Sequence, residues 1–424
     1  MDKKIFDFSM LAKMVPAFTL LVKPMRSLDV IFIGSVLSLL LCGNLSAAEP
    51  YPLMAWDYVD EEKTLKLMSE CGVNLVGFVR PQMLDACKKY KLKALVFDES
   101  IASDDYAIPF DAKLADNLPA LIKKVNKHPA VYGYHIKDEP GAAEFPALAH
   151  SVAKVKELAP DKWAYINLYP GMGADYDNYI EQFVKICKPT ILSYDNYPLG
   201  EDGKFSYGFW VNIAQMREAA RKHNLPFWNI ILTAPHWNYR ELTQADLRLQ
   251  MYGSLVYGAK GISFYKFISA SLPILKAPDL GNFRMAPLDQ FGEKTTTWDW
   301  LRNVNRQVQN IGPTMLKLRS DDVYHIGGDL PDRNHRPTET NLVKNIAGEF
   351  VVGDFTHEDG TRYVMVVNKN LTNSYRCMPE FHVAPKKLEF VSSWTGKVEK
   401  FPMPFYTYFL APGQGVLLRL NNEP

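Results

Sequence analysis

The sequence predicts an α/β protein: a (β/α)8 (TIM) barrel followed by a small antiparallel β-sandwich-like module. Three observations lead to this prediction. The chain has 424 residues, which fits a barrel of ~250 residues plus a smaller module. Short apolar runs alternate with longer helical patterns over residues 52–267, as βαβ units around a parallel sheet require. After about residue 321 only short strand patterns and turns follow.

The barrel prediction depends on the number of strands. Residues 52–267 contain eight candidate strands, and eight parallel strands close a barrel of this kind. The candidates are Leu53–Trp56, Asn74–Phe78, Ala94–Phe97, Val131–Ile136, Trp163–Leu168, Thr190–Tyr194, Phe227–Leu232 and Gly261–Phe267.

The segments between these strands have the periodicity of helices. Glu61–Cys71 is periodic, and Ala112–Lys127 carries its apolar residues on one face. Pro119 inside the second segment predicts a separate or kinked first turn. Thr243–Tyr257 begins with a Thr-x-x-Asp capping box and stops before Gly258.

A last helix and a change of pattern mark the end of the barrel. Thr296–Asn310 is predicted to be helical, and the pair Gly312-Pro313 is predicted to stop it. A hairpin turn is predicted at residues 357–360. We therefore predict a barrel over residues 49–318 and a C-terminal β module without helices over residues 319–424. The predicted strands of the module are Phe350–Asp354, Tyr363–Asn368, Leu388–Ser392 and Gly415–Leu420.

Composition and charge exclude several classes of protein. Hydrophobic residues make up 47% of the chain and charged residues 22%, as in ordinary globular proteins. The formal net charge of +1 gives no bias toward nucleic acid or an anionic membrane. The cysteines are scattered without a CxxC motif, so we expect buried free thiols and no zinc site.

Residues 1–48 have the pattern of an export signal. Met25 is a candidate start, an apolar run follows over Ile31–Leu41, and Ser46-Ala47-Ala48 supplies small residues for cleavage. The run is shorter than the ~20 residues of a membrane span. Lipidation at Cys42 is disfavoured, because the leucines before it lack the usual small residue. The sequence predicts a periplasmic or extracellular protein.

The rule that barrel enzymes place their active sites at the C-terminal strand ends selects the candidate site residues. Six of them are carboxylic acids, more than folding requires, because crowded like charges repel. Glycosidic bond cleavage needs one protonated carboxyl and one ionised carboxyl, and mutual repulsion separates their pKa values. The candidates are Asp57, Asp98, Glu99, Asp138, Glu139, Asp195, His236, Trp237, Tyr265 and Lys266.

The segment around the fourth strand carries a familiar pattern. Residues 132–140, Tyr-Gly-Tyr-His-Ile-Lys-Asp-Glu-Pro, resemble the strand-four segment of clan A glycoside hydrolases and their β-galactosidase-like relatives. Residues 192–198, 257–265 and 286–289 support the resemblance, which covers roughly residues 52–318. It implies a glycosidase barrel with Glu139 as its acid/base.

The sequence departs from clan A at the nucleophile. Clan A carries a Glu at the end of strand seven, whereas residues 227–234 contain no acid. Asp138 also stands where clan A commonly has Asn. Three alternatives remain open: another carboxylate has taken the role, the mechanism is inverting, or the barrel has lost catalysis.

We interpret Glu139 as the general acid, with Asp195 or Asp57 as the second carboxylate. The other candidates are interpreted as substrate-binding residues. Each has a structural alternative. Asp138 and Glu139 would complement the dipole of the helix after Pro140, and Asp195 would cap a loop. The remaining side chains would form ion pairs or pack, namely Asp98, Glu99, His236, Trp237, Tyr265 and Lys266.

Three functions compete at this stage. The leading one is an exported hydrolase that cleaves O-glycosidic bonds in a glycan. The second is a non-catalytic glycan-binding barrel, which the missing strand-seven acid favours. The third, a metal-dependent hydrolase, lacks a supporting histidine pattern, so we expect no metal or cofactor. The β module shows no row of exposed aromatic residues, which favours a structural role.

Overall fold

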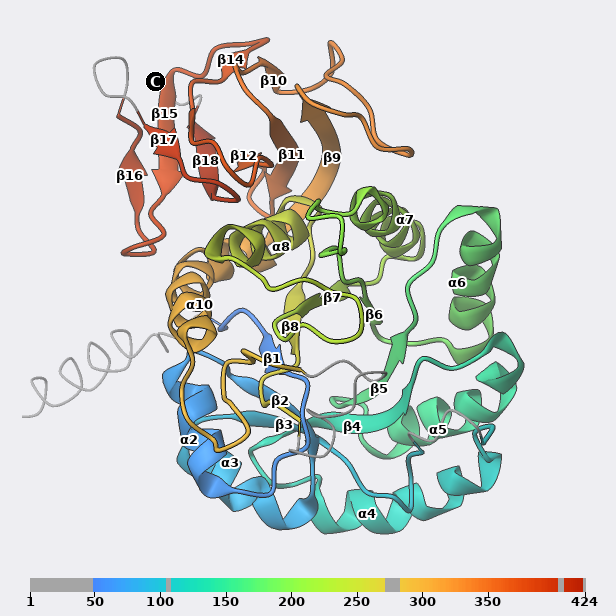
Figure 1. The fold of residues 1–424 in the computed structure, drawn as a ribbon. Coiled ribbons are helices and arrows are strands. Elements are labelled where there is room, and N and C mark those ends of the chain that lie inside the picture. The colour runs from blue at the N-terminus through green and yellow to red at the C-terminus, as the bar shows by residue number, and fades with distance from the viewer. Residues whose placement is uncertain (1–48, 104–107, 271–282, 403–407, 422–424) are drawn as a thin grey trace, which may run out of the picture. The chain divides into compact units, whose positions relative to one another are not determined.

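The computed structural model describes residues 49–103, 108–270, 283–402 and 408–421. Eight parallel strands form a closed barrel in chain order, and pairing of β1 with β8, through Leu53 and Ile262, completes the ring (Figure 1). The strands are β1 Leu53–Ala55, β2 Leu75–Val79, β3 Lys93–Val96, β4 Val131–Asp138, β5 Trp163–Leu168, β6 Leu192–Asp195, β7 Phe227–Leu232 and β8 Gly261–Tyr265. The predicted fold class is confirmed.

Helices surround the barrel (Figure 1). The segment with Pro119 divides as predicted, into a 3-10 turn, Ala112–Asn117, and helix α4. The predicted capping box is also present, because Thr243 Oγ1 accepts from the Asp246 backbone at 3.2 Å. The helices are α2 Glu62–Glu70, α3 Leu84–Lys89, α4 Leu118–Val125, α5 Phe145–Leu158, α6 Gly173–Cys187, α7 Tyr207–His223, α8 Gln244–Val256 and α10 Thr296–Leu316.

The predicted stop of the last helix at Gly312-Pro313 is wrong. Helix α10 continues through Pro313 to Leu316. Proline inside a helix costs about 3 kcal/mol, so packing must offset this cost. Gly312 lies so close to the barrel that an added Cβ would stand 2.4 Å from that of Tyr51. Lys260 then donates to the carbonyl oxygens of Met315, at 2.8 Å, and Leu316, at 3.1 Å, and so stabilises the helix end.

The C-terminal region is an antiparallel sheet of six strands in the order β16-β15-β18-β12-β11-β9. All four predicted strands are present, and the predicted hairpin turn at residues 357–360 joins β11 to β12. The sequence analysis missed β9, which follows α10 directly, and the shortest strands. The strands are β9 Leu318–Ile326, β10 Val343–Asn345, β11 Phe350–His357, β12 Arg362–Asn368, β13 Tyr375–Arg376, β14 Glu380–Phe381, β15 Lys387–Val391, β16 Val398–Lys400, β17 Phe409–Leu410 and β18 Gly415–Asn421.

This sheet packs against α8 on the outside of the barrel (Figure 1). Arg248 of α8 donates to the Pro412 carbonyl at 2.8 Å, and Gln414 donates to the Tyr252 hydroxyl at 3.0 Å. Residues 49–424 therefore form one compact unit. The division at 318/319 stays a prediction. The contacts with α8 agree with a structural role for the module.

Large aromatic side chains fill the barrel interior below the strand ends. Tyr132, Trp163 and Trp228 pack together. The ring centroids of Tyr132 and Trp163 lie 4.9 Å apart, and those of Trp163 and Trp228 lie 5.1 Å apart. Above them His135 lies 4.3 Å from Phe78, centroid to centroid. The interior is thus a packed core rather than a pore, and it forms a rigid floor for any site at the strand ends.

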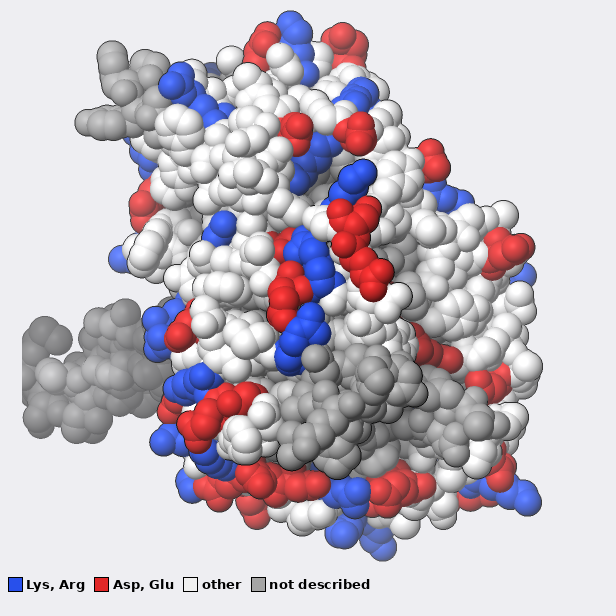
Figure 2. Space-filling view, in the orientation of Figure 1, with Lys and Arg blue, Asp and Glu red and all other residues white. Residues whose placement is uncertain are grey.

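Cys71, Cys87, Cys187 and Cys377 are buried and free, as expected. Acidic and basic side chains are interspersed on the face shown in Figure 2, in keeping with the net charge of +1. Within the described ranges, no helix has the length and apolar character needed to cross a bilayer. The predicted signal, residues 1–48, lies outside the described residues.

Candidate active site

A cavity of about 460 Å³ opens at the C-terminal ends of the barrel strands. We call it the central cavity. Residues from strands β1, β4, β5, β6, β7 and β8, and from the loops that follow them, form its wall. Its lining consists of Trp56, Asp138, Glu139, Asn167, Pro170, Asp195, Tyr197, Ile230, His236, Trp237, Tyr239 and Tyr265. The cavity therefore brings together six of the ten predicted site residues.

Three carboxylic acids cluster on one wall of the cavity. The carboxyls of Glu139 and Asp195 share a hydrogen bond. The amide nitrogen of Asn167 donates to Asp138 Oδ1 at 3.0 Å and to Asp195 Oδ1 at 2.9 Å. Asp138 and Asp195 are thus linked through one amide, and Glu139 is bonded to the second of them.

Local strand geometry places these side chains together. The register of β4 against β5 shifts between His135 and Lys137, which pairs Asp138 directly with Asn167. Glu139 follows in the left-handed region, at φ 44°, and its backbone N–H donates to the Asn167 carbonyl at 2.9 Å. A glutamate in this region is strained. The strand ends at Asp138, and the Glu139 side chain lines the central cavity.

Asn167 is fixed by a buried chain of hydrogen bonds. Ser193 Oγ donates to Asn167 Oδ1 at 3.0 Å, and the Tyr165 hydroxyl lies 2.5 Å from Ser193 Oγ. This chain orients the amide so that its nitrogen, rather than its oxygen, faces the acids. The sequence analysis missed Asn167. Its position near the end of the fifth predicted strand was the available signal, since the strand-end rule applies to every strand.

Burial and mutual repulsion raise the pKa values of this cluster. Burial, and then the charge of Asp138, raise the pKa of Glu139 to about 7. Burial raises the pKa of Asp195 well above its usual range, and the charges of Glu139 and Asp138 add to the effect. Asp195 is only 5% exposed. Burial and the neighbouring charges thus favour the protonated form of Asp195, while Glu139 stands near its midpoint at neutral pH.

The alternative that Asp138 and Glu139 serve a helix dipole does not match the geometry. Helix α5 begins at Phe145, after a short 3-10 turn over Ala142–Glu144. Glu144 stabilises the start of this turn, because its Oε2 accepts from the Gly141 N–H at 2.7 Å. The carboxyl of Asp138 instead accepts from Asn167.

Asp57 lies at the same end of the barrel but outside the cavity lining. Its Oδ2 accepts from the backbone N–H groups of Phe267, at 2.6 Å, and Ile268, at 3.0 Å. Its Oδ1 lies 3.5 Å from the ammonium of Lys266. Burial raises the pKa of Asp57 to about 6, against the lowering effect of Lys266. These partners hold the segment after β8, and their contacts favour a structural role for Asp57 and Lys266.

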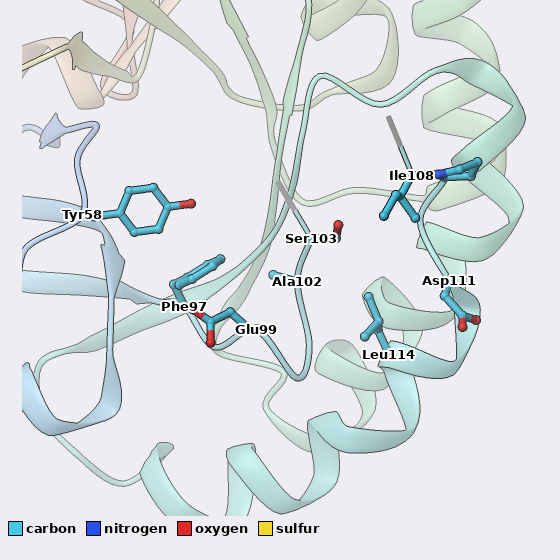
Figure 3. Close-up of a pocket in the computed structure, with 9 residues that line it drawn as sticks. Tyr58, Phe97, Glu99, Ala102, Ser103, Ile108, Asp111 and Leu114 are labelled. Carbon is cyan, nitrogen blue, oxygen red and sulfur yellow. The ribbon is translucent and has the colours of Figure 1, made fainter. Parts of the chain in front are cut away.

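Asp98 and Glu99 also lie outside the central cavity. Asp98 Oδ1 accepts from the backbone N–H and the hydroxyl of Ser100, at 3.0 Å and 2.6 Å. Glu99 accepts from Arg80 at 2.8 Å and lines a separate cavity of about 540 Å³. Figure 3 shows Glu99 there beside Phe97 and Tyr58. The structure therefore favours a structural role for these two acids: Asp98 caps its own loop, and Glu99 forms an ion pair with Arg80.

Aromatic side chains also line the central cavity. Tyr197 and Tyr265 stack with ring centroids 5.4 Å apart, and Tyr239 packs edge-on against Tyr197. Trp237 is 63% exposed at φ 47°, so its ring is open to a ligand. His236 is buried beneath it, and its Nδ1 lies 3.1 Å from the Ala234 carbonyl. Burial lowers the pKa of His236, which keeps it neutral.

The end of β7 carries no acid in the structure either. Leu232 ends the strand, and the Thr233 hydroxyl donates to the Lys266 carbonyl at 2.8 Å. Among the described lining residues the only acids are Asp138, Glu139 and Asp195. The described parts of the chain contain no group of three or more His, Cys, Asp or Glu side chains placed to hold a metal ion.

No protein-family profile and no curated protein matches the sequence. Solved structures do match the fold. A family 5 glycoside hydrolase from Bacteroides vulgatus has a TM-score of 0.57 and 12% identity, over 88% of this chain and 89% of its own. Another glycoside hydrolase has a TM-score of 0.55 and 11% identity, over 87% and 92%. The β-galactosidase from Marinomonas ef1 has a TM-score of 0.46 and 11% identity, over 61% of this chain and 60% of its own. The chain is thus similar in fold to glycoside hydrolases.

Proposed function

We propose that this protein is a glycoside hydrolase in which Glu139 is the general acid. One observation carries the proposal: Glu139 lies at the end of β4 and lines a cavity of about 460 Å³, where it is hydrogen-bonded to a second buried carboxyl. A general acid needs a pKa near the working pH. Burial and the charge of Asp138 raise the pKa of Glu139 to about 7 and so supply this property.

The exposed ring of Trp237 and the stacked tyrosines support a glycan as substrate. Aromatic faces pack on the C–H faces of sugar rings, while carboxylates and amides accept from sugar hydroxyls. The fold shared with glycoside hydrolases agrees with this class but does not supply the chemistry.

We propose that Asp195 positions Glu139 rather than attacking the sugar. The carboxyls of a retaining pair lie ≈ 5–5.5 Å apart and those of an inverting pair ≈ 6.5–9.5 Å apart. Asp195 is closer than either separation, because its carboxyl is hydrogen-bonded to that of Glu139. Its raised pKa also favours the protonated form, and a protonated carboxyl is a poor nucleophile.

A screen of chromogenic glycosides and polysaccharides tests the proposed function. We expect the wild type to release sugar from at least one substrate and Glu139→Gln to lose that activity. Glu157→Gln, which removes an exposed acid on α5, is the matched control. Activity that survives in Glu139→Gln would remove the assignment.

The absence of an acid at the end of β7 favours a second candidate, a non-catalytic glycan-binding barrel. This candidate predicts glycan binding to the wild type without turnover. Binding that Glu139→Gln leaves intact, with no product from either protein, would select it over the hydrolase.

We further propose that the protein is exported, on the basis of the signal pattern in residues 1–48. N-terminal sequencing of the natively produced protein is expected to begin near Glu49. An intact Met25–Ala48 segment in a cytosolic fraction would contradict export.

A further inference from the structure

A second cavity, of about 590 Å³, lies at the end of the barrel opposite to the central cavity. Phe227, the first residue of β7, and Lys260, which directly precedes β8, both line it, so it opens at the N-terminal ends of these strands. Arg217 of α7, Tyr257 and Leu318 are also part of its lining. We call it the basal cavity.

Five basic side chains from three separate segments converge on the basal cavity. They are Arg217 and Arg221 of α7, Lys260 between α8 and β8, and Lys317 and Arg319 where α10 passes into β9. The described part of the lining contains one acid, Glu358. Like charges placed together repel, so packing alone does not favour this gathering. A cavity lined mainly by one sign of charge instead attracts ligands of the opposite sign.

The hydrogen bonds of these cations go mainly to neutral groups. Arg217 Nε donates to a serine hydroxyl of β9 at 2.8 Å, and Arg221 donates to a backbone carbonyl of the same strand. Lys260 donates to three backbone carbonyls, at 2.8 Å, 3.1 Å and 2.5 Å. Of the five, only Arg319 forms an ion pair within the described ranges, with Asp321 at 3.0 Å. Four positive charges therefore stand at the cavity without a carboxylate partner among the described residues.

Arg217 and Lys260 carry their charges in an unfavourable environment. Arg217 Nη2 is buried, and no described residue accepts a hydrogen bond from it. Burial, and then the charge of Arg221, lower the pKa of Arg217 to about 10. Burial also lowers the pKa of Lys260 to about 8. A lowered pKa means that the surroundings disfavour the charged form, and an anion in the cavity would offset this effect in both residues.

We propose that the basal cavity binds a doubly charged oxyanion, phosphate or sulfate, either free or as an ester on a sugar. The cations come from three segments, which matches the several acceptor oxygens of a tetrahedral dianion better than a planar carboxylate. Leu225, Pro226 and Phe227 supply an apolar part of the lining, against which the group that carries an ester would pack. This site is separate from the proposed glycosidase site, which lies at the other end of the barrel.

Titration calorimetry of the wild-type protein with sodium sulfate and sodium phosphate tests the proposal, with sodium chloride at equal ionic strength as the control. We expect saturable binding of both dianions with a Kd of about 1 mM or lower. The absence of saturable heat up to about 10 mM, or an equal response to chloride, would overturn the proposal.

Glucose 6-phosphate and glucose 6-sulfate distinguish the two sources of the oxyanion, with glucose as their control. Tighter binding of the esters than of the free ions would identify a charged sugar as the ligand. Equal or weaker binding of the esters would identify the free ion.

Two variants and a control locate the binding site. Arg221→Gln and Lys317→Gln each remove one exposed charge from the basal cavity, and each should weaken sulfate binding about tenfold. Arg306→Gln removes an exposed arginine of α10 outside the cavity lining and should leave the affinity unchanged. Unchanged affinity in both cavity variants, or an equal loss in Arg306→Gln, would place the ion elsewhere and overturn the proposal. Glu139→Gln should bind sulfate like the wild type, so failure of the glycosidase assignment leaves this test intact.

Discussion

The two sides of the barrel mouth contain buried carboxylates in opposite electrostatic situations. On the side of β1 and β8, Asp57 has two backbone donors and Lys266 as partners. On the side of β4 and β6, Glu139 and Asp195 have each other and the nearby Asp138. Both arrangements raise pKa values through burial. Only the carboxyls of the second side line the central cavity.

The largest expected effect is on activity and lies on the side of β4 and β6. Glu139→Gln keeps the shape and hydrogen bonding but removes the proton, so kcat/KM should fall about 10²–10⁴-fold. Substrates with activated leaving groups should lose least, because they need little protonation. In the wild type, kcat/KM should decline as the pH rises through about 7, where Glu139 loses its proton. Steady-state kinetics across pH with both substrate types provide the measurement, and equal losses for both types would argue against a general acid.

On the side of β1 and β8, substitutions are expected to lower the stability of the fold instead. Asp57→Ala leaves the Phe267 and Ile268 N–H groups without an acceptor and Lys266 without its carboxylate. We expect a loss of about 3 kcal/mol in the free energy of unfolding, measured with urea. Glu99→Gln breaks only the exposed pair with Arg80 and should cost less than about 1 kcal/mol. Equal losses in the two variants would contradict the structural role of Asp57.

The difference in stability between the wild type and Glu139→Gln should depend on pH. Its pKa is raised in the folded protein from 4.5 to about 7, so the folded state binds the proton more tightly than the unfolded state. Wild-type stability from this group is therefore lost as the pH rises between these values. Glu139→Gln should gain about 3 kcal/mol relative to the wild type between pH 4 and pH 8. Urea unfolding at both pH values measures it, and a gain at low pH instead would reverse the assignment.

The smallest effect is expected for Asp195→Asn. Because burial favours the protonated form of Asp195, an asparagine amide should replace its hydrogen bond to Glu139 with little change of charge. We expect less than a tenfold loss in kcat/KM, and a greater loss in Asp195→Leu, which removes the hydrogen bond. A loss of more than about 10³-fold with activated substrates would identify Asp195 as the attacking group after all.

Local sequence patterns are sufficient to predict the strands of the barrel. Trp163–Leu168 and Phe227–Leu232 were predicted with the bounds that the structure has, because buried parallel strands read as short apolar runs between turn residues. Prediction was wrong where long-range packing overrides a local signal. Gly312-Pro313 is a stop in sequence, but contact with Tyr51 keeps α10 helical to Leu316.

The sequence by itself determined that acids gather at the barrel mouth, since strand periodicity places strand ends on one rim. Only the tertiary structure decided their partners. It joins Asp57 to a segment 210 residues later and aims Asn167 at two acids from neighbouring strands. It also places Asp98 and Glu99 outside the central cavity. The physical reason is that charge state depends on burial and on atoms within a few ångströms, which a one-dimensional pattern does not contain.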